Sequence, residues 1–185
     1  KKRSISYVFD PDWAPFEWTN DFGKHTGIIY DLLSLVSQKS GIVFKPVAVE
    51  SWTEAVKLAE SQKVDMYSGV GENESRKKYM NFTKNSIYKT PYIFMVHKDD
   101  LHDHFETFKT VDKDEKIAVV DGYTIHNILK IKHPDIKLIT VPSISDGLKK
   151  LQNKEIDVFV LNAVTAKYYI NKKGFDNLKI ITKTQ

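Results

Sequence analysis

The sequence predicts an α/β protein built from two βαβαβ lobes that are joined by a hinge. Three observations support this: strand-like and helix-like segments alternate along the first 70 residues, a capped helix and a buried strand recur at constant spacing, and one strand-like segment links the halves. Alternating strands and helices are typical of a parallel sheet. The predicted lobes are residues 1–95 and 96–185.

The composition is that of a globular protein with no strong charge bias. Of 185 residues, 41% are hydrophobic and 28% are charged, and 28 Lys and Arg oppose 24 Asp and Glu for a net charge of +4. This bias is too weak to indicate nucleic acid as a partner. The sequence contains no cysteine, which excludes disulfides, thiol nucleophiles and zinc-thiolate sites. It has no apolar run of about 18 residues, and no apolar h-region follows its first four residues, so it predicts neither a membrane span nor a signal peptide in these residues.

The first lobe contains the elements of one βαβαβ unit. We expect a strand at 4–9, an aromatic loop, a helix from Gly27 to about Gly41, a strand at 42–49, a helix capped by Ser51, and a strand at 64–69. Apolar residues at helical spacing define the first helix, and Gly41 is suited to its C-terminus. Ser51 with Glu54 forms a capping box.

An internal repeat with an offset of 92 residues indicates a second, similar lobe. Ser51 aligns with Ser143, and Asp65 with Asp157, while apolar residues align between them. Any two βα units share some of this pattern, which leaves coincidence as the alternative. Against it, the second copy also follows a strand at 116–120 and a helix at 123–132. Two homologous lobes are the simplest explanation.

Residues 88–97 form an aromatic and β-branched segment between the two lobes. We expect a strand that runs from one lobe to the other, where a hinge would lie. A last strand is expected at 178–182.

Ligands of open parallel sheets bind beyond the carboxyl ends of the strands. This rule selects three segments in the first lobe (10–16, 50–52 and 68–76) and two in the second (121–125 and 161–163). The expected site is therefore a cleft between the lobes.

The segment Ser68-Gly69-Val70-Gly71 can bring bare backbone close to a ligand, and Arg76 follows it. An arginine there can form a bidentate pair with a carboxylate. The alternative is a solvated charge, because Arg76 begins a basic cluster beside acidic residues. A dinucleotide fingerprint is excluded because Glu74 occupies the position of its third glycine.

The helix that begins at Tyr123 and Thr124 directs free amides at the expected cleft, which favours an anion. Asp121 or Thr124 capping the same helix is an equally common arrangement, and both can hold together. Three loop aromatics at the expected cleft rim, Trp13, Phe16 and Trp52, either cover a ligand or serve only in packing.

The sequence carries no catalytic or cofactor motif that links several residues. The pair His102 and His104 has no third ligand nearby, and Asp112 and Asp114 lack the rest of a calcium loop. We therefore expect binding rather than catalysis, with no metal and no cofactor.

Several of these motifs together resemble the bacterial extracellular solute-binding proteins of family 3, which are type II periplasmic-binding-protein or Venus flytrap domains. In the first half they are Trp13-x-Pro15-Phe16, Gly27 before Asp31-Leu32, Val64-Asp65 before Ser68-Gly69, Glu74-x-Arg76-Lys77-Lys78 and Phe82-Thr83. In the second half they are Ala118-Val119-Val120-x-Gly122-Tyr123-x-Ile125 and Ile156-Asp157-Val158-Phe159. The resemblance covers nearly the whole chain.

The resemblance implies specific roles for the selected residues. In amino-acid-binding members, the arginine at the place of Arg76 clamps the α-carboxylate, amides at the place of Thr124 assist, and aromatics at the places of Trp13 and Trp52 form walls. The family usually has an acid that receives the α-ammonium where this chain has Asn162, and often a threonine where it has Gly71. The full candidate set is Asp10, Trp13, Trp52, Ser68, Gly69, Gly71, Arg76, Tyr123, Thr124, Ile125 and Asn162.

The sequence around Thr124 is similar to flytrap domains of membrane-bound signalling receptors. We therefore expect a periplasmic or otherwise extracytoplasmic sensor domain for an amino acid or related small carboxylate, attached to a membrane-bound signalling domain. The alternative is the solute-binding subunit of an ABC transporter, with a permease as partner. A dehydratase of the prephenate or arogenate type is a lower-ranked alternative. The family fold normally returns to the first lobe, so we expect a return segment that these 185 residues do not include.

Overall fold

The computed structural model describes residues 3–100, 108, 114–172 and 174–181. Its contacts divide the chain into two compact units, unit 1 (Lys1–Gly71) and unit 2 (Glu72–Gln185), which are described separately below. The lobe limits of 1–95 and 96–185 stay predictions.

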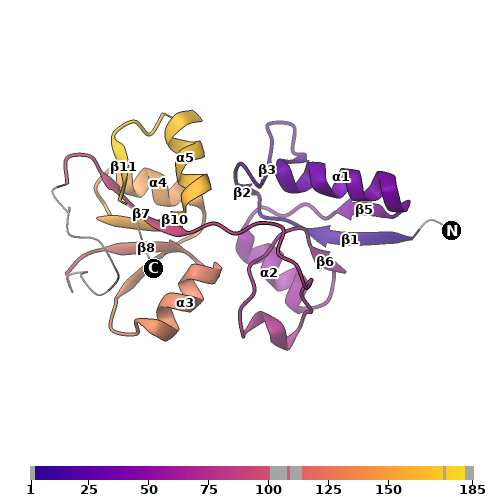
Figure 1. The fold of residues 1–185 in the computed structure, drawn as a ribbon. Helices are drawn as coiled ribbons and strands as arrows, with labels where there is room; N and C mark the ends of the chain where they lie inside the picture. The colour runs from indigo at the N-terminus through magenta and orange to yellow at the C-terminus, as the bar shows by residue number, and fades with distance from the viewer. Residues whose placement is uncertain (1–2, 101–107, 109–113, 173, 182–185) are drawn as a thin grey trace. The chain divides into compact units, whose positions relative to one another are not determined.

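Unit 1 contains the predicted βαβαβ arrangement. Its strands β1 (Ser4–Val8), β5 (Val43–Pro46) and β6 (Met66–Tyr67) form a parallel sheet in the order β5-β1-β6. Helices α1 (Ile28–Ser40) and α2 (Trp52–Glu60) lie on opposite faces of this sheet (Figure 1). Helix α1 ends at Gly41 in the left-handed conformation, as predicted. Because β1 is central, its carboxyl end lies between those of its neighbours.

The aromatic segment expected as a loop forms a small antiparallel sheet instead. Its strands are β2 (Asp12–Trp13), β3 (Glu17–Thr19) and β4 (His25–Thr26). Asn20 stabilises the turn between β3 and β4, because its Oδ1 accepts from the backbone N–H groups of Phe22 and Lys24, both at 3.0 Å. Strands of two or three residues are too short to show an alternating pattern in the sequence.

Unit 2 contains a five-stranded mixed sheet in the order β11-β7-β10-β8-β9. Strands β8 (Ile117–Val120), β9 (Leu138–Val141) and β10 (Val158–Asn162) are parallel, with helices α3 (Thr124–Lys132) and α4 (Ile144–Gln152) between them. Strand β7 (Tyr92–His97) is antiparallel to both β10 and β11 (Leu178–Ile181). The segment that was predicted to run between lobes thus contributes an inner strand to this sheet. The predicted end of the last strand, Thr182, lies outside the described residues.

Helices cover both faces of the unit 2 sheet. Helix α3 lies on one face, and α4 and α5 (Ala163–Lys172) lie on the other (Figure 1). Ile125 and Leu129 of α3 join a buried cluster with alternate residues of the three strands β7, β8 and β10, such as Phe94 and Val119. On the α4 face, Gly147 lies directly against the ring of Phe159.

The 92-residue repeat is present in three dimensions and extends to details. Ser51 and Ser143 both cap their helices, because each side chain accepts from the backbone N–H three residues later. The donors are Glu54 N–H at 3.2 Å and Asp146 N–H at 3.1 Å. Each helix is followed by a residue with positive φ, 55° at Gln62 and 58° at Lys154. In each copy an aspartate of the following turn then accepts from the backbone of the neighbouring segment: Asp65 from Ser6 N–H at 2.7 Å, and Asp157 from Lys116 N–H at 2.8 Å.

Several predicted strands are longer than the observed ones. The segments 42–49, 64–69 and 88–97 contain strands of residues 43–46, 66–67 and 92–97. Tyr123 is the N-cap of α3 rather than its first helical residue.

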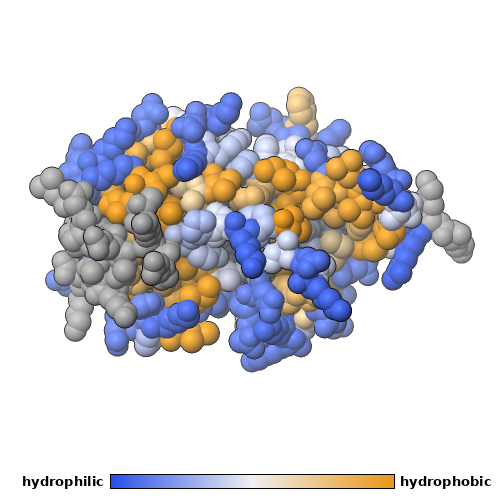
Figure 2. Space-filling model, in the orientation of Figure 1, coloured by the Kyte–Doolittle hydropathy of each residue, from blue (hydrophilic) through white to orange (hydrophobic). Residues whose placement is uncertain are grey.

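Helix α1 exposes much of its apolar stripe. Ile29 is its fully buried residue, whereas Ile28 and Leu35 are half exposed. Figure 2 shows hydrophobic side chains gathered over this region of unit 1. Among the described residues, no helix combines the length and the apolar character needed to cross a membrane.

We predict that Gly147→Ala destabilises unit 2. A Cβ at this position would lie 2.3 Å from Cζ of Phe159, so the rigid ring would have to shift. Overpacking of this kind costs about 1–3 kcal/mol, whereas Gly→Ala in an open helix position normally stabilises by up to about 1 kcal/mol. Urea denaturation measures the change, with the exposed Lys149→Ala of the same helix as the control. An increase in stability would contradict the packing at Gly147.

Candidate functional site

The segment after β1 holds Asp10 in a fixed, buried position. The Asp10 side chain accepts from Asp12 N–H at 2.9 Å, and Asp10 N–H donates to Glu17 Oε1 at 3.2 Å. The predicted site residue at the carboxyl end of β1 is therefore ordered by its own turn and by β3.

The segment after β6 lies against β1 and α1. Ser68 N–H donates to Val8 O at 3.0 Å, and Ser68 Oγ contacts both Val8 O and Glu17 Oε2. A Cβ on Gly69 would come within 2.4 Å of Ile29 Cδ1, so the glycine permits close packing on α1. Gly71, at the end of unit 1, is exposed. The sequence proposed these glycines for ligand approach, and the structure gives Gly69 a packing role as well.

The predicted wall aromatics of unit 1 differ in their surroundings. Trp13 is half-buried, and its ring centroid lies 4.9 Å from that of Phe16. Trp52 is buried as the first residue of α2, with its ring centroid 5.5 Å from that of Tyr67. Trp52 therefore packs in the core of unit 1, and its predicted contact with a ligand stays a prediction.

Arg76 is buried in unit 2 and is not a solvated charge. It begins a short 3₁₀ helix (Arg76–Lys78) and is 3% exposed. Asn73 organises this turn, since its Oδ1 accepts from Arg76 N–H and from the Ser75 hydroxyl, both at 2.9 Å. The neighbouring Lys77 is exposed and pairs with Glu72 and Glu74. Of the two alternatives open from the sequence, burial excludes the solvated one.

The guanidinium of Arg76 reaches the start of α3. Its Nη1 donates to Thr124 Oγ1 at 2.9 Å, and its Nη2 donates to Gly122 O at 2.8 Å. The Tyr92 hydroxyl of β7 hydrogen bonds to the Thr124 side chain. Burial raises the pKa of Tyr92, while the Arg76 charge and the Thr124 bond oppose that shift. The structure thus brings Arg76 and Thr124 together, as predicted, and adds Tyr92.

His126 of α3 stabilises the turn that precedes this helix. Gly122 N–H donates to His126 Nδ1 at 3.2 Å, and Asp121 Oδ1 lies 3.3 Å from the same nitrogen. Burial and then Lys130 lower the pKa of His126, opposed by Asp121, which agrees with a neutral ring that accepts from Gly122. The Ile125 side chain lies in the core, so its predicted role in binding is limited to its backbone amide. Tyr123 packs partly against the same core.

Asn162 is the last residue of β10 and directly precedes α5, which begins at Ala163. Its Oδ1 accepts from Thr165 N–H at 2.8 Å, which is the bond of an N-cap, and the side chain is buried. It lies opposite Tyr92 in the β10–β7 register. Because β10 and β8 are neighbours, Asn162 and Thr124 follow the carboxyl ends of adjacent parallel strands.

Sequence reasoning missed Glu17, His25, Asn73 and Tyr92. Tyr92 fell inside a segment that was interpreted only as a strand, Glu17 and His25 fell in segments without a recognised motif, and Asn73 lay in the selected segment 68–76 without being singled out. Asn73 is the one with a usable sequence indication, because Asn three residues before a helix start commonly forms such a turn.

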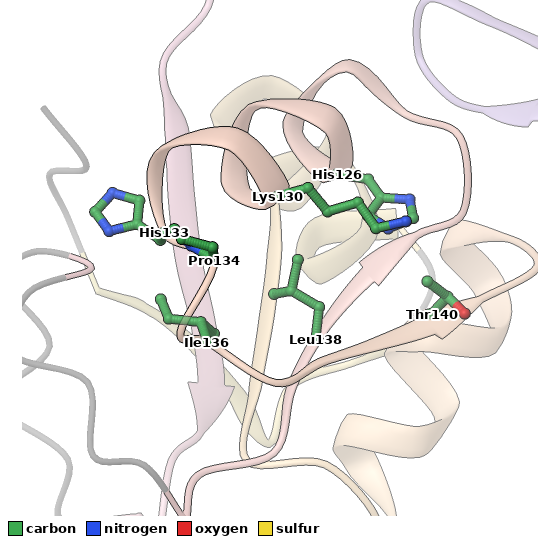
Figure 3. A pocket seen from close by; sticks show the side chains of 7 residues that line it. All are labelled: His126, Lys130, His133, Pro134, Ile136, Leu138 and Thr140. Atoms are coloured by element: carbon green, nitrogen blue, oxygen red, sulfur yellow. The ribbon is translucent and has the colours of Figure 1, made fainter.

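A pocket on the outer face of α3 and β9 lies apart from these predicted residues. It is lined by His126, Lys130, His133, Pro134, Ile136, Leu138 and Thr140 (Figure 3). None of the eleven predicted binding residues lines it.

Comparisons with known proteins identify relatives of this fold. Over 168 residues, the chain is 25% identical to the sensor protein EvgS of Escherichia coli K12; this covers 91% of the chain but 14% of EvgS. A histidine kinase sensor domain with similarity to periplasmic binding proteins superposes with a TM-score of 0.85 at 21% identity, covering all of this chain and 78% of that one. An ancestral arginine-binding protein bound to glutamine gives 0.84 at 20% identity, with coverage of 100% and 80%.

The chain also matches a family model over most of its length. Residues 5–156 match the model of the bacterial extracellular solute-binding proteins, family 3. These residues include ten of the eleven predicted binding positions, all but Asn162. With its type II α/β fold, this chain belongs to the bacterial extracellular solute-binding proteins, family 3.

Proposed function

We propose that this domain binds a small solute through a carboxylate, which Arg76 and the start of α3 hold. The observation that carries the proposal is the burial of Arg76, which is 3% exposed and whose guanidinium bonds to the turn between parallel strand β8 and helix α3 and to the first residue of that helix. A charge is seldom buried without a function or a partner.

The chemistry of this corner of unit 2 matches a carboxylate. Guanidinium groups present several N–H donors in a plane, which suits bidentate pairing with carboxylate oxygens. The bonds to Thr124 and Gly122 use one donor on each of two nitrogens. The first amides of α3 have no acceptor within the helix, and the helix dipole favours negative charge there.

Asn162 favours an acceptor on the ligand over an ammonium group. Its neutral amide has no negative charge to pair with an ammonium group; its Oδ1, which has two lone pairs, already accepts from Thr165 N–H, and its NH₂ has two donors. Arg76, the α3 amides and Asn162 are then all donors. We infer that the ligand presents anionic or carbonyl oxygens to unit 2.

The relatives support a sensory role outside the cytoplasm. EvgS is named a sensor protein, and the chain spans about one seventh of its length; a domain of that kind requires an attached membrane-bound signalling part. The likeness to an arginine-binding protein supports the second candidate, a solute-binding subunit of an ABC transporter. We propose binding without catalysis in either role.

Thermal denaturation against a panel of amino acids, 2-oxo acids, dicarboxylates and polyamines tests the proposal. A carboxylate ligand at about 100 times its Kd should stabilise the chain by roughly 2.7 kcal/mol. Arg76→Ala should abolish this shift because the clamp is lost, and Arg76→Lys should weaken it because a lysine cannot pair through two nitrogens. The control is Lys77→Ala, which removes the neighbouring exposed charge and should leave the shift intact.

Stabilisation by polyamines alone would contradict the carboxylate proposal. Unchanged carboxylate affinity in both Arg76 variants would contradict the clamp while leaving solute binding in place.

Asn162→Asp tests the preferred ligand class. The aspartate keeps the cap on α5, because its oxygen still accepts from Thr165 N–H, but it adds a negative charge. Affinity for a dicarboxylate or 2-oxo acid found in the panel should fall about tenfold, which corresponds to roughly 1.4 kcal/mol. Isothermal titration calorimetry measures it, and Asn162→Ala separates the charge effect from the loss of the cap. Tighter binding of such an acid would contradict the inference.

A further inference from the structure

Unit 1 buries a chain of polar side chains that the proposed carboxylate clamp does not use. Glu17 of β3, His25 of β4, Tyr7 of β1 and Ser68 after β6 are all buried, and Glu17 has no exposed surface. These four residues link the small antiparallel sheet to the parallel sheet of unit 1. We call them the Glu17 cluster.

The Glu17 carboxyl joins two segments that follow different strands. Its Oε1 accepts from Asp10 N–H at 3.2 Å, just after β1, and its Oε2 contacts Ser68 Oγ, just after β6. His25 Nε2 lies 3.4 Å from the same Oε2. Asp10 and Ser68 are two of the predicted binding residues, and they follow the carboxyl ends of the neighbouring strands β1 and β6.

The hydrogens of this cluster balance best when the carboxyl is neutral. Ser68 has one hydroxyl hydrogen but faces two oxygens, Glu17 Oε2 and, at 3.2 Å, Val8 O. A proton on Oε2 lets Glu17 donate to Ser68 while Ser68 donates to Val8 O. An ionised carboxylate would instead take the Ser68 hydrogen, and Val8 O would keep only its bond from Ser68 N–H.

The titratable groups around Glu17 agree with this protonation. Burial raises the pKa of Glu17 to about 8, opposed by its bonds from Ser68 and Asp10, and burial lowers the pKa of His25 to about 4. Tyr7, whose pKa burial raises to about 12, contacts His25 Nδ1 at 2.8 Å. Tyr30 of α1 faces the His25 ring with centroids 5.4 Å apart, and Asp10 is the other nearby acid.

We propose that Glu17 is a positioning residue that works as a neutral carboxylic acid and fixes the backbone of Asp10 and the hydroxyl of Ser68. That Asp10 and Ser68 contact a ligand rests on the proposed function. The protonation of Glu17 and its contacts with the segments after β1 and β6 do not depend on that function. When Glu17 loses its proton, the Ser68 hydroxyl turns toward the carboxylate and away from Val8 O.

The sign of the pH effect follows from linkage. Between pH about 4.5 and 8 the unfolded chain has an ionised Glu17 and the folded chain a neutral one, so stability falls as pH rises. His25 acts in the opposite direction between about pH 4 and 6.5. The two effects offset each other up to about pH 6.5, and Glu17 alone remains from there to about pH 8.

The test measures urea unfolding of the full chain, without ligand, from pH 6 to 8.5. Wild type should show an unfolding constant that rises up to about tenfold per pH unit between 6.5 and 8. Glu17→Gln should lose this slope, because an amide keeps both an acceptor for Asp10 N–H and a donor for Ser68 and does not titrate. It should also be more stable than wild type over this range, because the unfolded wild-type chain is stabilised by ionisation of Glu17 above about pH 4.5. Glu60→Gln, at an exposed position, should keep the wild-type slope.

Heteronuclear NMR separates positioning from stability alone. The amide signals of Asp10 and Ser68 should titrate in this range in wild type and stay fixed in Glu17→Gln. Ser68→Ala removes a bond that lowers the pKa of Glu17, so it should move this transition to higher pH. This variant tests the proposal if Glu17→Gln does not fold.

Equal pH slopes in wild type and Glu17→Gln, or signals of Asp10 and Ser68 that do not titrate in wild type, would overturn the proposal. These experiments use no ligand, so their outcome does not depend on whether any solute of the panel binds. Failure of the Glu17 proposal would likewise leave the carboxylate proposal in place.

Discussion

Burial of an ionisable group at the carboxyl ends of parallel strands is the constraint around which both units are organised. In unit 2 the group is Arg76, and its guanidinium fixes the Gly122 turn, the Thr124 hydroxyl and, through Thr124, Tyr92. In unit 1 the group is Glu17, which joins the segments after β1 and β6. Buried groups of this kind must be satisfied by hydrogen bonds. Arg76 and Glu17 therefore each fix the conformation of the loop segments that they bond to.

The two groups meet this requirement by opposite means. Arg76 stays charged, since a guanidinium does not lose its proton in proteins, and is solvated by neutral oxygens and by a helix end. Glu17 can become neutral, which removes most of the cost of its burial. A permanently charged group suits recognition of an anion, whereas a group that titrates suits the ordering of its neighbours. His126 shows a third arrangement, in which a neutral ring accepts from the Gly122 turn behind the arginine.

The sequence was sufficient to predict the parts of this fold that depend on local periodicity and capping. The parallel βαβαβ order of unit 1, the caps at Ser51 and Ser143, and the 92-residue repeat are all observed. The strands β2 to β4 were not predicted, because their pairing depends on contacts across a hairpin rather than on a pattern within each strand. For the same reason Arg76 could be selected from its place after a strand, but its burial could not. The Glu17 cluster joins four segments, and no spacing in the sequence relates them.

The repeated helix has a consequence for how the chain acquires its structure. In each copy the serine cap, the nine-residue helix and the closing residue of positive φ complete their hydrogen bonds within roughly a dozen consecutive residues. Contacts this local form early, because little loop entropy is lost before they are made. Each half of the chain thus contains its own local nucleus, and the aspartate that follows it, Asp65 or Asp157, bonds to a segment much earlier in the chain, at Ser6 or Lys116. Assembly of the two sheets can begin independently, and nascent chain emerging from the ribosome can organise its first half before the second has been synthesised.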